Sequence, residues 1–417
     1  MAEKQNTPEI RFEGFTDPWE QRKLGDCFEF LKNNTLSRAG LNGENGTARN
    51  VHYGDILIKF GDCLDGERSD LPFITDDTVL PKFTGSILRE GDVIFADTAE
   101  DEAAGKCVEL RKLPKEPTIS GLHTIPARPR FPFGTGYLGH YLNSDAYHRQ
   151  LLPLMQGIKV ISVSKASLQD TQVRFPGLSE QTAIGAALSE IDALITLHQS
   201  KYDKLCTVKK SMLDKMFPKP GETEPEIRFE GFTDPWEQRK FSDMYVVNNE
   251  RNANCELGYD RTLSIATMTF NGGNGAADDS LSNYKVIRIG DIAFEGHTNK
   301  VHAYGRFVLN DAGDGLMSPR FSCLRPIVEQ RYSFWKYYIP REESMRPILV
   351  NATKSGTMMN ELVPDDLMRE SILVPCLAEQ EVIGNSLSQL DHLITLHQRK
   401  LELLRNIKKS LLDRMFV

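Results

Sequence analysis

The feature that most constrains this chain is a duplication. The segment PEIRFEGFTDPWEQRK, residues 8–23, recurs without a change at residues 225–240. A second pair of segments, residues 178–217 and 377–416, agrees at more than half of its positions, whereas the stretches between the repeats scarcely agree. Repeats of this kind predict two equivalent halves that share a frame and present two different surfaces. We therefore expect the function to lie in the two unlike stretches.

Composition limits the class of protein. The chain has 417 residues, 40% of them hydrophobic and 26% charged, so each half can bury an ordinary core. The seven cysteines are scattered without a C-x-x-C pair, which predicts reduced thiols in a cytoplasmic protein and neither a zinc site nor a disulfide scaffold. The start of the chain has no apolar signal region, and no apolar run approaches the length of a membrane span. We expect no membrane contact.

The net charge of -8 bears on nucleic-acid binding. A protein that binds DNA alone normally has a basic surplus, because it must neutralise phosphates. The acidic balance counts against a self-sufficient DNA-binding protein. It leaves open a local basic face within a larger complex.

The second repeat pair predicts two long helices that form a coiled coil. Apolar residues recur there at alternating steps of four and three, the spacing of a coiled-coil seam. A lone helix of about 36 residues, a rod of about 54 Å, buries too little apolar surface to be stable. We expect the two helices to pair antiparallel. The predicted seam residues are Ile184, Leu188, Ile191, Ile195, His198 and Leu205 in the first copy, and Ile383, Leu387, Leu390, Ile394, His397 and Leu404 in the second.

The unlike blocks read as mixed α/β with many short strands. Residues 87–97 and 286–296 each place a G-D turn before a β-rich run, and residues 53–60 predict another strand. The predicted fold class is α+β, with two globular α/β domains separated by an antiparallel coiled coil in a pseudo-two-fold arrangement. The predicted boundaries are 1–177 for the first domain, 178–217 for the first helix, 218–224 for a linker, 225–376 for the second domain and 377–417 for the second helix.

No constellation for catalysis emerges. Residues 134–139, GTGYLG, match G-x-G-x-x-G, but prolines stand where a strand should precede the loop, so we interpret it as a loop without a cofactor. We interpret His198 and His397 as polar seam residues that fix the helix register, in preference to a metal or pH-sensing pair. The carboxylates of residues 97–102 are interpreted as solvated surface. We expect no catalytic residue and no metal site.

Aromatic and polar residues offer two further signals. The repeat carries Phe12, Phe15 and Trp19, which could stack on nucleobases but are better explained as packing against a helix end, since they are the same in both copies. Loops in the unlike blocks combine Asn, Arg, Lys, His and Thr, the residue types that contact base edges and phosphates. Off the seam, Leu194 and Leu197, like Leu393 and Leu396, are candidates for docking to other subunits.

These features together resemble a known family. Paired variable blocks, the P-x-L-x-E-Q entry into each long helix, the closing KKSLLDRMF and the opening RFEGFTDPWEQRKLGD are similar to the specificity subunit of a type I restriction-modification system. The resemblance implies a non-catalytic subunit whose two variable blocks are target recognition domains, each contacting one half of a bipartite site in double-stranded DNA. It also implies that the paired helices set the spacer and dock two modification (methyltransferase) subunits, which restriction (motor-nuclease) subunits then join.

The resemblance further implies that this chain holds no cofactor. S-adenosylmethionine, ATP and Mg²⁺ would be bound by the partner subunits, and the docking surface would lie on the seam helices. Two alternatives stay open: a stand-alone sequence-specific DNA-binding protein, such as a repressor or architectural protein, and a complete methyltransferase or nuclease. The implied DNA-contacting loops contain Lys32, Asn33, Asn34, Thr35, Thr98, Gln156 and Lys159 in the first block, and Arg251, Asn252, Asn254, His297, Thr298, Asn299, Lys300, Lys354 and Ser355 in the second.

Overall fold

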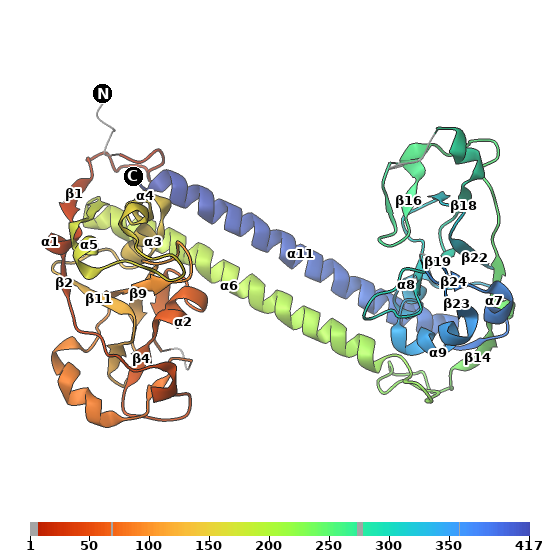
Figure 1. The fold of residues 1–417 in the computed structure, drawn as a ribbon, viewed down its shortest axis with the longest axis horizontal. Helices are drawn as coiled ribbons and strands as arrows, with labels where there is room; N and C mark the ends of the chain where they lie inside the picture. The colour runs from red at the N-terminus through yellow and green to blue at the C-terminus, as the bar shows by residue number, and fades with distance from the viewer. Residues whose placement is uncertain (1–6, 68–69, 273–277, 358) are drawn as a thin grey trace. The chain divides into compact units, whose positions relative to one another are not determined.

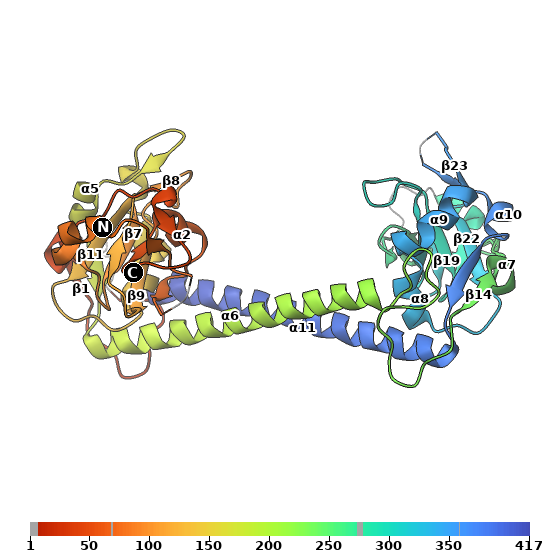
Figure 2. The same cartoon turned by 90° about the horizontal axis from the view of Figure 1, so that it is seen from below.

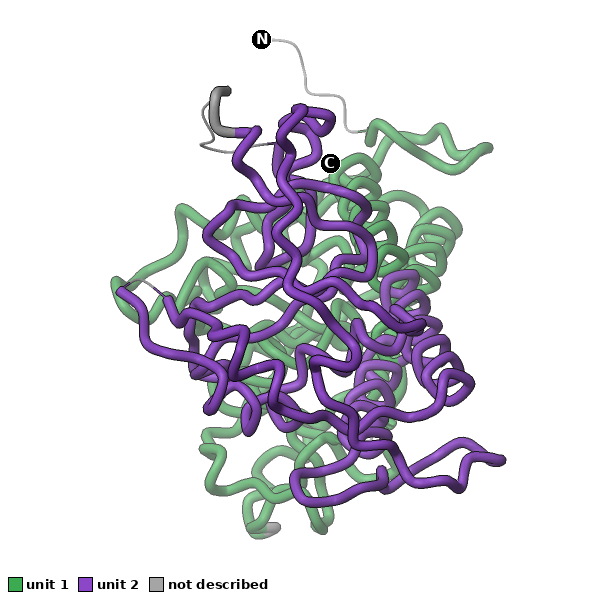
Figure 3. Tube along the Cα trace, turned by 90° about the vertical axis from the view of Figure 1, so that its right-hand side faces the viewer, with its two compact units in different colours: residues 1–200, 398–417 green, residues 201–397 purple. Residues whose placement is uncertain are grey.

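The chain divides into two compact units. The computed structural model describes residues 7–67, 70–272, 278–357 and 359–417. Unit 1 comprises Met1–Ser200 with Gln398–Val417, and unit 2 comprises Lys201–His397 (Figure 3). The two long helices, α6 (Leu178–Lys215) and α11 (Leu377–Met415), each belong partly to unit 1 and partly to unit 2.

Within each unit, parts of α6 and α11 run alongside each other in opposite directions (Figure 1). In unit 1 the Arg405 guanidinium donates to Gln199 Oε1 at 3.1 Å, and in unit 2 Lys209 Nζ lies 2.5 Å from Asp391 Oδ1. The predicted antiparallel pairing is therefore confirmed. Among the predicted seam residues, Ile184, Leu188, Ile383 and Leu387 are buried, and the remaining ones, including His198 and His397, are half-buried.

Unit 1 is built on a five-stranded sheet of order β2-β11-β7-β9-β5 and a four-stranded sheet of order β10-β4-β6-β3. Its main core packs α3 and the sheet against the start of α6 and the end of α11. The strands are β1 (Glu20–Lys23), β2 (Phe28–Phe30), β3 (Leu41–Asn42), β4 (Arg49–Val51), β5 (Cys63–Asp65), β6 (Phe73–Ile74), β7 (Val93–Ala96), β8 (Thr98–Ala99), β9 (Cys107–Lys112), β10 (Thr118–Ser120), β11 (Thr124–Pro129), β12 (Ile161–Ser162) and β13 (Gln172–Phe175). The shorter helices are α1 (Leu24–Cys27), α2 (Tyr53–Ile58), α3 (Tyr137–Asn143), α4 (Asp145–His148) and α5 (Lys165–Asp170).

Unit 2 repeats this plan on a four-stranded sheet of order β15-β22-β19-β20. Its main core packs α8 and α9 against the sheet, the start of α11 and the end of α6. The strands are β14 (Glu237–Lys240), β15 (Tyr245–Val247), β16 (Leu263–Ser264), β17 (Thr269–Phe270), β18 (Lys285–Ile287), β19 (Ile292–Glu295), β20 (Arg306–Leu309), β21 (Gly315–Met317), β22 (Ser322–Pro326), β23 (Thr353–Lys354), β24 (Glu361–Leu362) and β25 (Ser371–Val374). The shorter helices are α7 (Phe241–Met244), α8 (Tyr332–Tyr338), α9 (Glu342–Ala352) and α10 (Pro364–Leu367).

The duplicated segment joins the two long helices in each unit. In unit 1 the buried Trp19 ring packs edge-on against Phe416, next to the end of α11, with the ring centroids 6.4 Å apart. In unit 2 Trp236 makes the same contact with Phe217, next to the end of α6, also at 6.4 Å. The predicted packing role of these tryptophans is confirmed.

Two strand predictions are confirmed and one is wrong. Strands β7 and β19 follow turns at Gly91 and Gly290, which adopt φ of +83° and +89°, values that favour glycine. Residues 53–60, however, contain the helix α2. The His52 side chain caps this helix by accepting from the Gly54 amide at 3.2 Å, and Asp55 in its first turn pairs with Lys59 at 3.1 Å, one helical turn on. Both contacts favour a helix over the strand that the alternating sequence predicts.

Residues 216–236, between α6 and β14, contain no helix or strand and include the predicted linker at 218–224. Across the described residues, no helix is both long enough and apolar enough to cross a membrane.

Candidate nucleic-acid interface

In unit 1 three of the predicted loops lie next to one another. The Asn33 side chain donates to Gly121 O at 3.2 Å, and Thr98 lies 3.5 Å from the ring of His123, two residues further on. Strand β8, which begins at Thr98, pairs with β12, and the backbone of Gln156 bridges to Ser162 in β12. Figure 2 shows β8 on the side of unit 1 away from the long helices. The first block therefore presents its polar loops as one surface.

The hairpin that ends this surface has an unusual tip. Lys159 is exposed, and Ile158 beside it is 99% exposed, although burial is the usual state of isoleucine. Gly157 permits the turn with φ of +117°. A cation next to a protruding apolar side chain suits contact with a phosphate and with the face of a base.

Not every predicted residue is available for contact. Asn34 is only 1% exposed, its amide donates to Ser120 O at 3.0 Å, and its carbonyl accepts from the Leu36 amide at 3.0 Å. These bonds hold the loop in place, so we leave Asn34 out of the proposed interface. Lys32 and Thr35 on either side of the loop are exposed.

In unit 2 two of the predicted loops lie side by side. The 297–300 loop follows β19, and the Asn360 amide donates to Gly296 O at 2.9 Å, which joins this loop to the β23–β24 hairpin that contains Lys354 and Ser355. The Asn299 carbonyl accepts from the amides of Val301 and His302 and shapes the loop, leaving Thr298 and Lys300 exposed.

Two of the predicted unit 2 residues lie beside carboxylates. The ring of His297 lies 2.6 Å from Glu295 Oε1, and Lys354 Nζ lies 3.4 Å from Glu361. Both side chains are mostly exposed, so these contacts are weak.

The third predicted loop of unit 2 lies elsewhere. Asn252 is buried and its amide donates to Leu257 O at 2.9 Å, while Arg251 donates to Asn283 O at 2.6 Å. Asn254 is exposed. Among the described residues, these contacts connect the loop to the segment before β18 and not to the 297–300 loop.

A ring cluster in unit 1 was missed from the sequence. Tyr53 lies between two imidazoles, with ring centroids 4.7 Å from His52 and 5.3 Å from His123. His123 also lies 3.3 Å from Asp97, beside Thr98. Burial lowers the pKa of His52, which favours a neutral ring. Aromatic rings next to polar loops can stack on bases. The cluster was hidden because residues 53–60 were assigned to a strand.

The glycine-rich loop at residues 134–139 binds the protein's own side chains. The amides of Gly136 and Gly139 donate to the Glu109 carboxylate at 2.5 and 2.9 Å, and the Gly134 amide donates to Gln181 Oε1 at 2.9 Å. Burial raises the pKa of Glu109, although these backbone bonds oppose the rise. The amides that would face a cofactor phosphate in a nucleotide-binding loop are thus used internally.

A buried charge cluster joins the globular part of unit 1, outside the long helices, to both α6 and α11. Ligand-type atoms of Asp62, His140 and Asp192 lie within 4.8 Å of one another, a spacing that could hold a metal ion. Lys408 of α11, however, places its ammonium 2.7 Å from Asp62 and 2.5 Å from Asp192, and so supplies the positive charge itself. Burial alone would lower the pKa of His140, but its bonds to Asp192 and Cys63 raise it to about 10.

Unit 2 holds a related but simpler cluster. Asp391 on α11 accepts from Lys209 of α6 at 2.5 Å and from the Tyr337 hydroxyl at 2.6 Å. In each unit one aspartate therefore connects the two long helices to the globular part: Asp192 in unit 1 and Asp391 in unit 2. Sequence reasoning missed both clusters because their members come from distant segments.

Comparison with known proteins gives the following results. No family model matches the chain. A curated relative from Methanocaldococcus jannaschii, which bears the name of the type I restriction enzyme MjaX specificity subunit, is 20% identical over 95% of this chain and 92% of its own length. The crystal structure of the type I restriction-modification system S subunit from M. genitalium is 12% identical, covers 99% of both chains and has a TM-score of 0.59.

A second solved structure, the HsdS subunit from Thermoanaerobacter tengcongensis, covers 97% of this chain and 98% of its own, with 17% identity and a TM-score of 0.43. The fold assignment rests on the M. genitalium structure, which spans both units and both long helices. In sequence and in fold, this chain resembles over nearly its whole length the specificity subunits of type I restriction-modification systems.

Proposed function

We propose that the chain is the DNA-specificity subunit of a type I restriction-modification complex, in which each unit contacts one half of a bipartite site. The observation that carries this proposal is the placement of unlike residues at equivalent positions. The loop after β7 in unit 1 and the loop after β19 in unit 2 each lie beside a second polar hairpin, yet one contains Thr98 and the other His297–Lys300. A shared scaffold with different contact residues suits two different half-sites.

The long helices support a docking role. Leu194 and Leu197 of α6, like Leu393 and Leu396 of α11, are exposed and lie in the sequence LITLHQ, which both helices share. Exposed apolar side chains at matching positions suit two copies of one partner. In the proposed complex these partners are two modification subunits, and restriction subunits join through the assembly.

The proposal makes this chain non-catalytic. Methyl transfer from S-adenosylmethionine would take place in the modification subunits, and the ATP and Mg²⁺ of the restriction reaction would be bound by the restriction subunits. This division of labour fits the net charge of -8, since partner subunits would supply part of the phosphate neutralisation. We place the complex in the cytoplasm, next to its DNA substrate.

Exchange of one block tests the proposal. Residues 24–174 would be replaced by the corresponding block of another specificity subunit, and the chimera co-expressed with modification subunits. Methyladenine mapping should then show one changed half-site and one retained half-site. The matched chimera with residues 241–373 exchanged should change the other half-site. A change in both half-sites, or methylation by the purified chain alone, would refute the proposal.

A further inference from the structure

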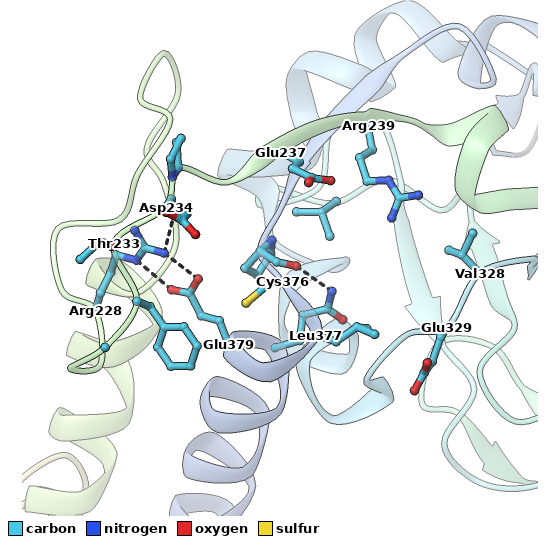
Figure 4. Close-up of a pocket in the computed structure, with 16 residues that line it drawn as sticks. Arg228, Thr233, Asp234, Glu237, Arg239, Val328, Glu329, Cys376, Leu377 and Glu379 are labelled. Atoms are coloured by element: carbon cyan, nitrogen blue, oxygen red, sulfur yellow. Dashed lines mark hydrogen bonds and ion pairs between the residues drawn. The ribbon is translucent and has the colours of Figure 1, made fainter.

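Corresponding positions of the two units can be matched by their contacts. In unit 2 Arg228 forms two hydrogen bonds with Glu379 at the start of α11, at 2.9 and 2.7 Å (Figure 4). In unit 1 Arg11 forms the same two bonds with Glu180 at the start of α6, at 2.8 and 2.6 Å. The two units therefore share one framework. Positions at which unlike residues stand on this framework are candidates for reading two different half-sites.

The main sheets of the two units can be matched in the same way. Arg128 of β11 places Nη2 2.7 Å from Asp92, in the turn before β7. Arg325 of β22 places Nη2 2.9 Å from Asp291, in the turn before β19. Arg128 and Arg325 therefore correspond.

The strand register agrees with this match. Ile125 of β11 lies opposite Phe95 of β7, and Ser322 of β22 lies opposite Phe294 of β19. Ile125 and Ser322 each stand three residues before the matched arginine. The position two residues before them lies in a turn that leads into the strand, at residues 122–123 in unit 1 and 319–320 in unit 2.

His123 occupies this turn position in unit 1. Its backbone adopts φ of +54°, a left-handed value that is uncommon outside glycine and is found often at functional sites. The Asp97 amide donates to His123 O at 3.0 Å, and Asp97 Oδ1 lies 3.3 Å from Nδ1 of the ring. The side chain is 48% exposed and lies beside Thr98 of β8. Because the carboxylate favours a proton on Nδ1, Nε2 is left as a hydrogen-bond acceptor.

Arg320 occupies the same position in unit 2 and is exposed. It borders a hollow that Gly296 and Asn360 also line, so it lies next to the 297–300 loop. Gly296 corresponds to Asp97 of unit 1, and a Cβ there would collide with the carbonyl oxygen of Asn360. A carboxylate therefore cannot take the place of Asp97 beside Arg320.

The charges around this hollow leave Arg320 available. Glu361 also lines the hollow, but its carboxylate pairs with Lys354 at 3.4 Å. Glu295, at the end of β19, lies 3.7 Å from Arg306. With the residues that the structure describes, the Arg320 guanidinium forms no hydrogen bond or ion pair. An exposed arginine of this kind, next to polar loops, is suited to contact with acceptor atoms of DNA.

We propose that this turn position determines specificity, with His123 contacting a base in one half-site and Arg320 contacting a base in the other. The inference rests on the proposed function, which supplies double-stranded DNA as the ligand. The Arg320 guanidinium has two parallel donors that match O6 and N7 of guanine in the major groove. Nε2 of His123 offers one acceptor, which suits the amino group of adenine or cytosine. The shared framework thus presents side chains of opposite hydrogen-bonding character.

Removal of one side chain at a time tests this inference. The full chain would be co-expressed with modification subunits and its methylated site mapped across a genome, with block exchange assigning each half-site to its unit. The variants are Arg320→Ala and His123→Gly, since glycine tolerates the positive φ of residue 123. The control is Arg369→Ala, which removes the same charge from an arginine of unit 2 that is 78% exposed and pairs with Asp366.

Arg320→Ala should relax the requirement for guanine at one position of one half-site, with discrimination there at least about tenfold weaker. His123→Gly should relax one adenine or cytosine position in the other half-site, by a smaller factor because one hydrogen bond is lost instead of two. The control should keep the native site. In each variant, retention of the unaltered half-site shows that the chain is folded.

Two results would overturn the inference alone. The first is an unchanged methylated site in either variant. The second is binding that is weaker for all sequences, with a salt-dependence slope smaller by about 1, because this indicates a phosphate contact. Failure of the native chain to direct methylation to a bipartite site would instead overturn the proposed function.

Discussion

The buried charge cluster of unit 1 predicts that a single substitution, Lys408→Met, strongly destabilises unit 1. Lys408→Met keeps the length of the side chain but removes the ammonium between Asp62 and Asp192. The side chains of Lys408 and Asp62 are 17% and 15% exposed, so in this largely buried setting Asp62 would lose the ammonium that lies 2.7 Å from it, and Asp192 would keep only its bond to His140. Removing one partner of a buried pair costs about 3–5 kcal/mol. Because Asp192 is 30% exposed, we expect the lower end, about 3 kcal/mol.

The matched control is Lys209→Met in unit 2. Lys209 and Asp391 are 26% and 35% exposed, and the neutral Tyr337 hydroxyl still donates to that carboxylate. A more exposed pair with a single carboxylate should contribute about 1 kcal/mol. The two lysines occupy corresponding places on the two helices, so the comparison measures the combined effect of deeper burial and of the second carboxylate.

Native-state hydrogen exchange read by mass spectrometry can measure both effects. Lys408→Met should speed exchange about 100-fold in residues 178–200 and 398–415, because about 3 kcal/mol of opening free energy is lost there. Lys209→Met should speed exchange less than tenfold in residues 201–215 and 377–397. Equal effects of the two substitutions, or an effect below tenfold for Lys408→Met, would refute the assignment of Lys408 to a buried ion cluster.

Three further outcomes are expected. The folded pKa of His140 is raised to about 10, so its stabilisation is complete below about pH 6.5 and is lost as pH rises through about 10; the hydrogen-exchange protection factors of unit 1, which correct for the intrinsic rise of exchange with pH, should fall over that range, and His140→Tyr should abolish the fall. Arg11→Ala leaves the buried Glu180 unpaired and should cost about 3–5 kcal/mol, seen as a lower unfolding temperature in calorimetry; an unchanged temperature would contradict the buried pair. Lys159→Ala and Lys300→Ala should each reduce the salt-dependence slope of DNA binding by the complex by about 1, and an unchanged slope would remove that lysine from the interface.

The long helices were predictable because their signal is local. The apolar spacing through Ile184 and Ile383 is repeated over many turns, and a helix with one apolar stripe requires a partner. Strands β7 and β19 were predictable for a similar reason, since a G-D turn and a β-rich run stand next to each other in the sequence. The duplicated tryptophans could be assigned to packing because they are identical in both halves.

The remaining features depend on contacts that residue types do not reveal. Asn34 and Asn252 have the composition of a DNA-contacting loop, yet their amides are used by nearby backbone groups. Lys408 and Asp62 meet only because the last part of α11 packs against the globular part of unit 1, far from it in the sequence. No local pattern could place them together.

Unit 1 is formed from two distant stretches of the chain, so it cannot complete its core on the ribosome until the end of the chain is synthesised. Its core includes Met415 and Phe416, whose side chains pack with Trp19 and Tyr137. These residues are translated after the whole of unit 2, so at about 5–20 residues per second the nascent unit 1 waits about 10–40 s for them. During that interval its aromatic residues lack their final partners and are open to chaperones, whereas unit 2 emerges as one continuous stretch.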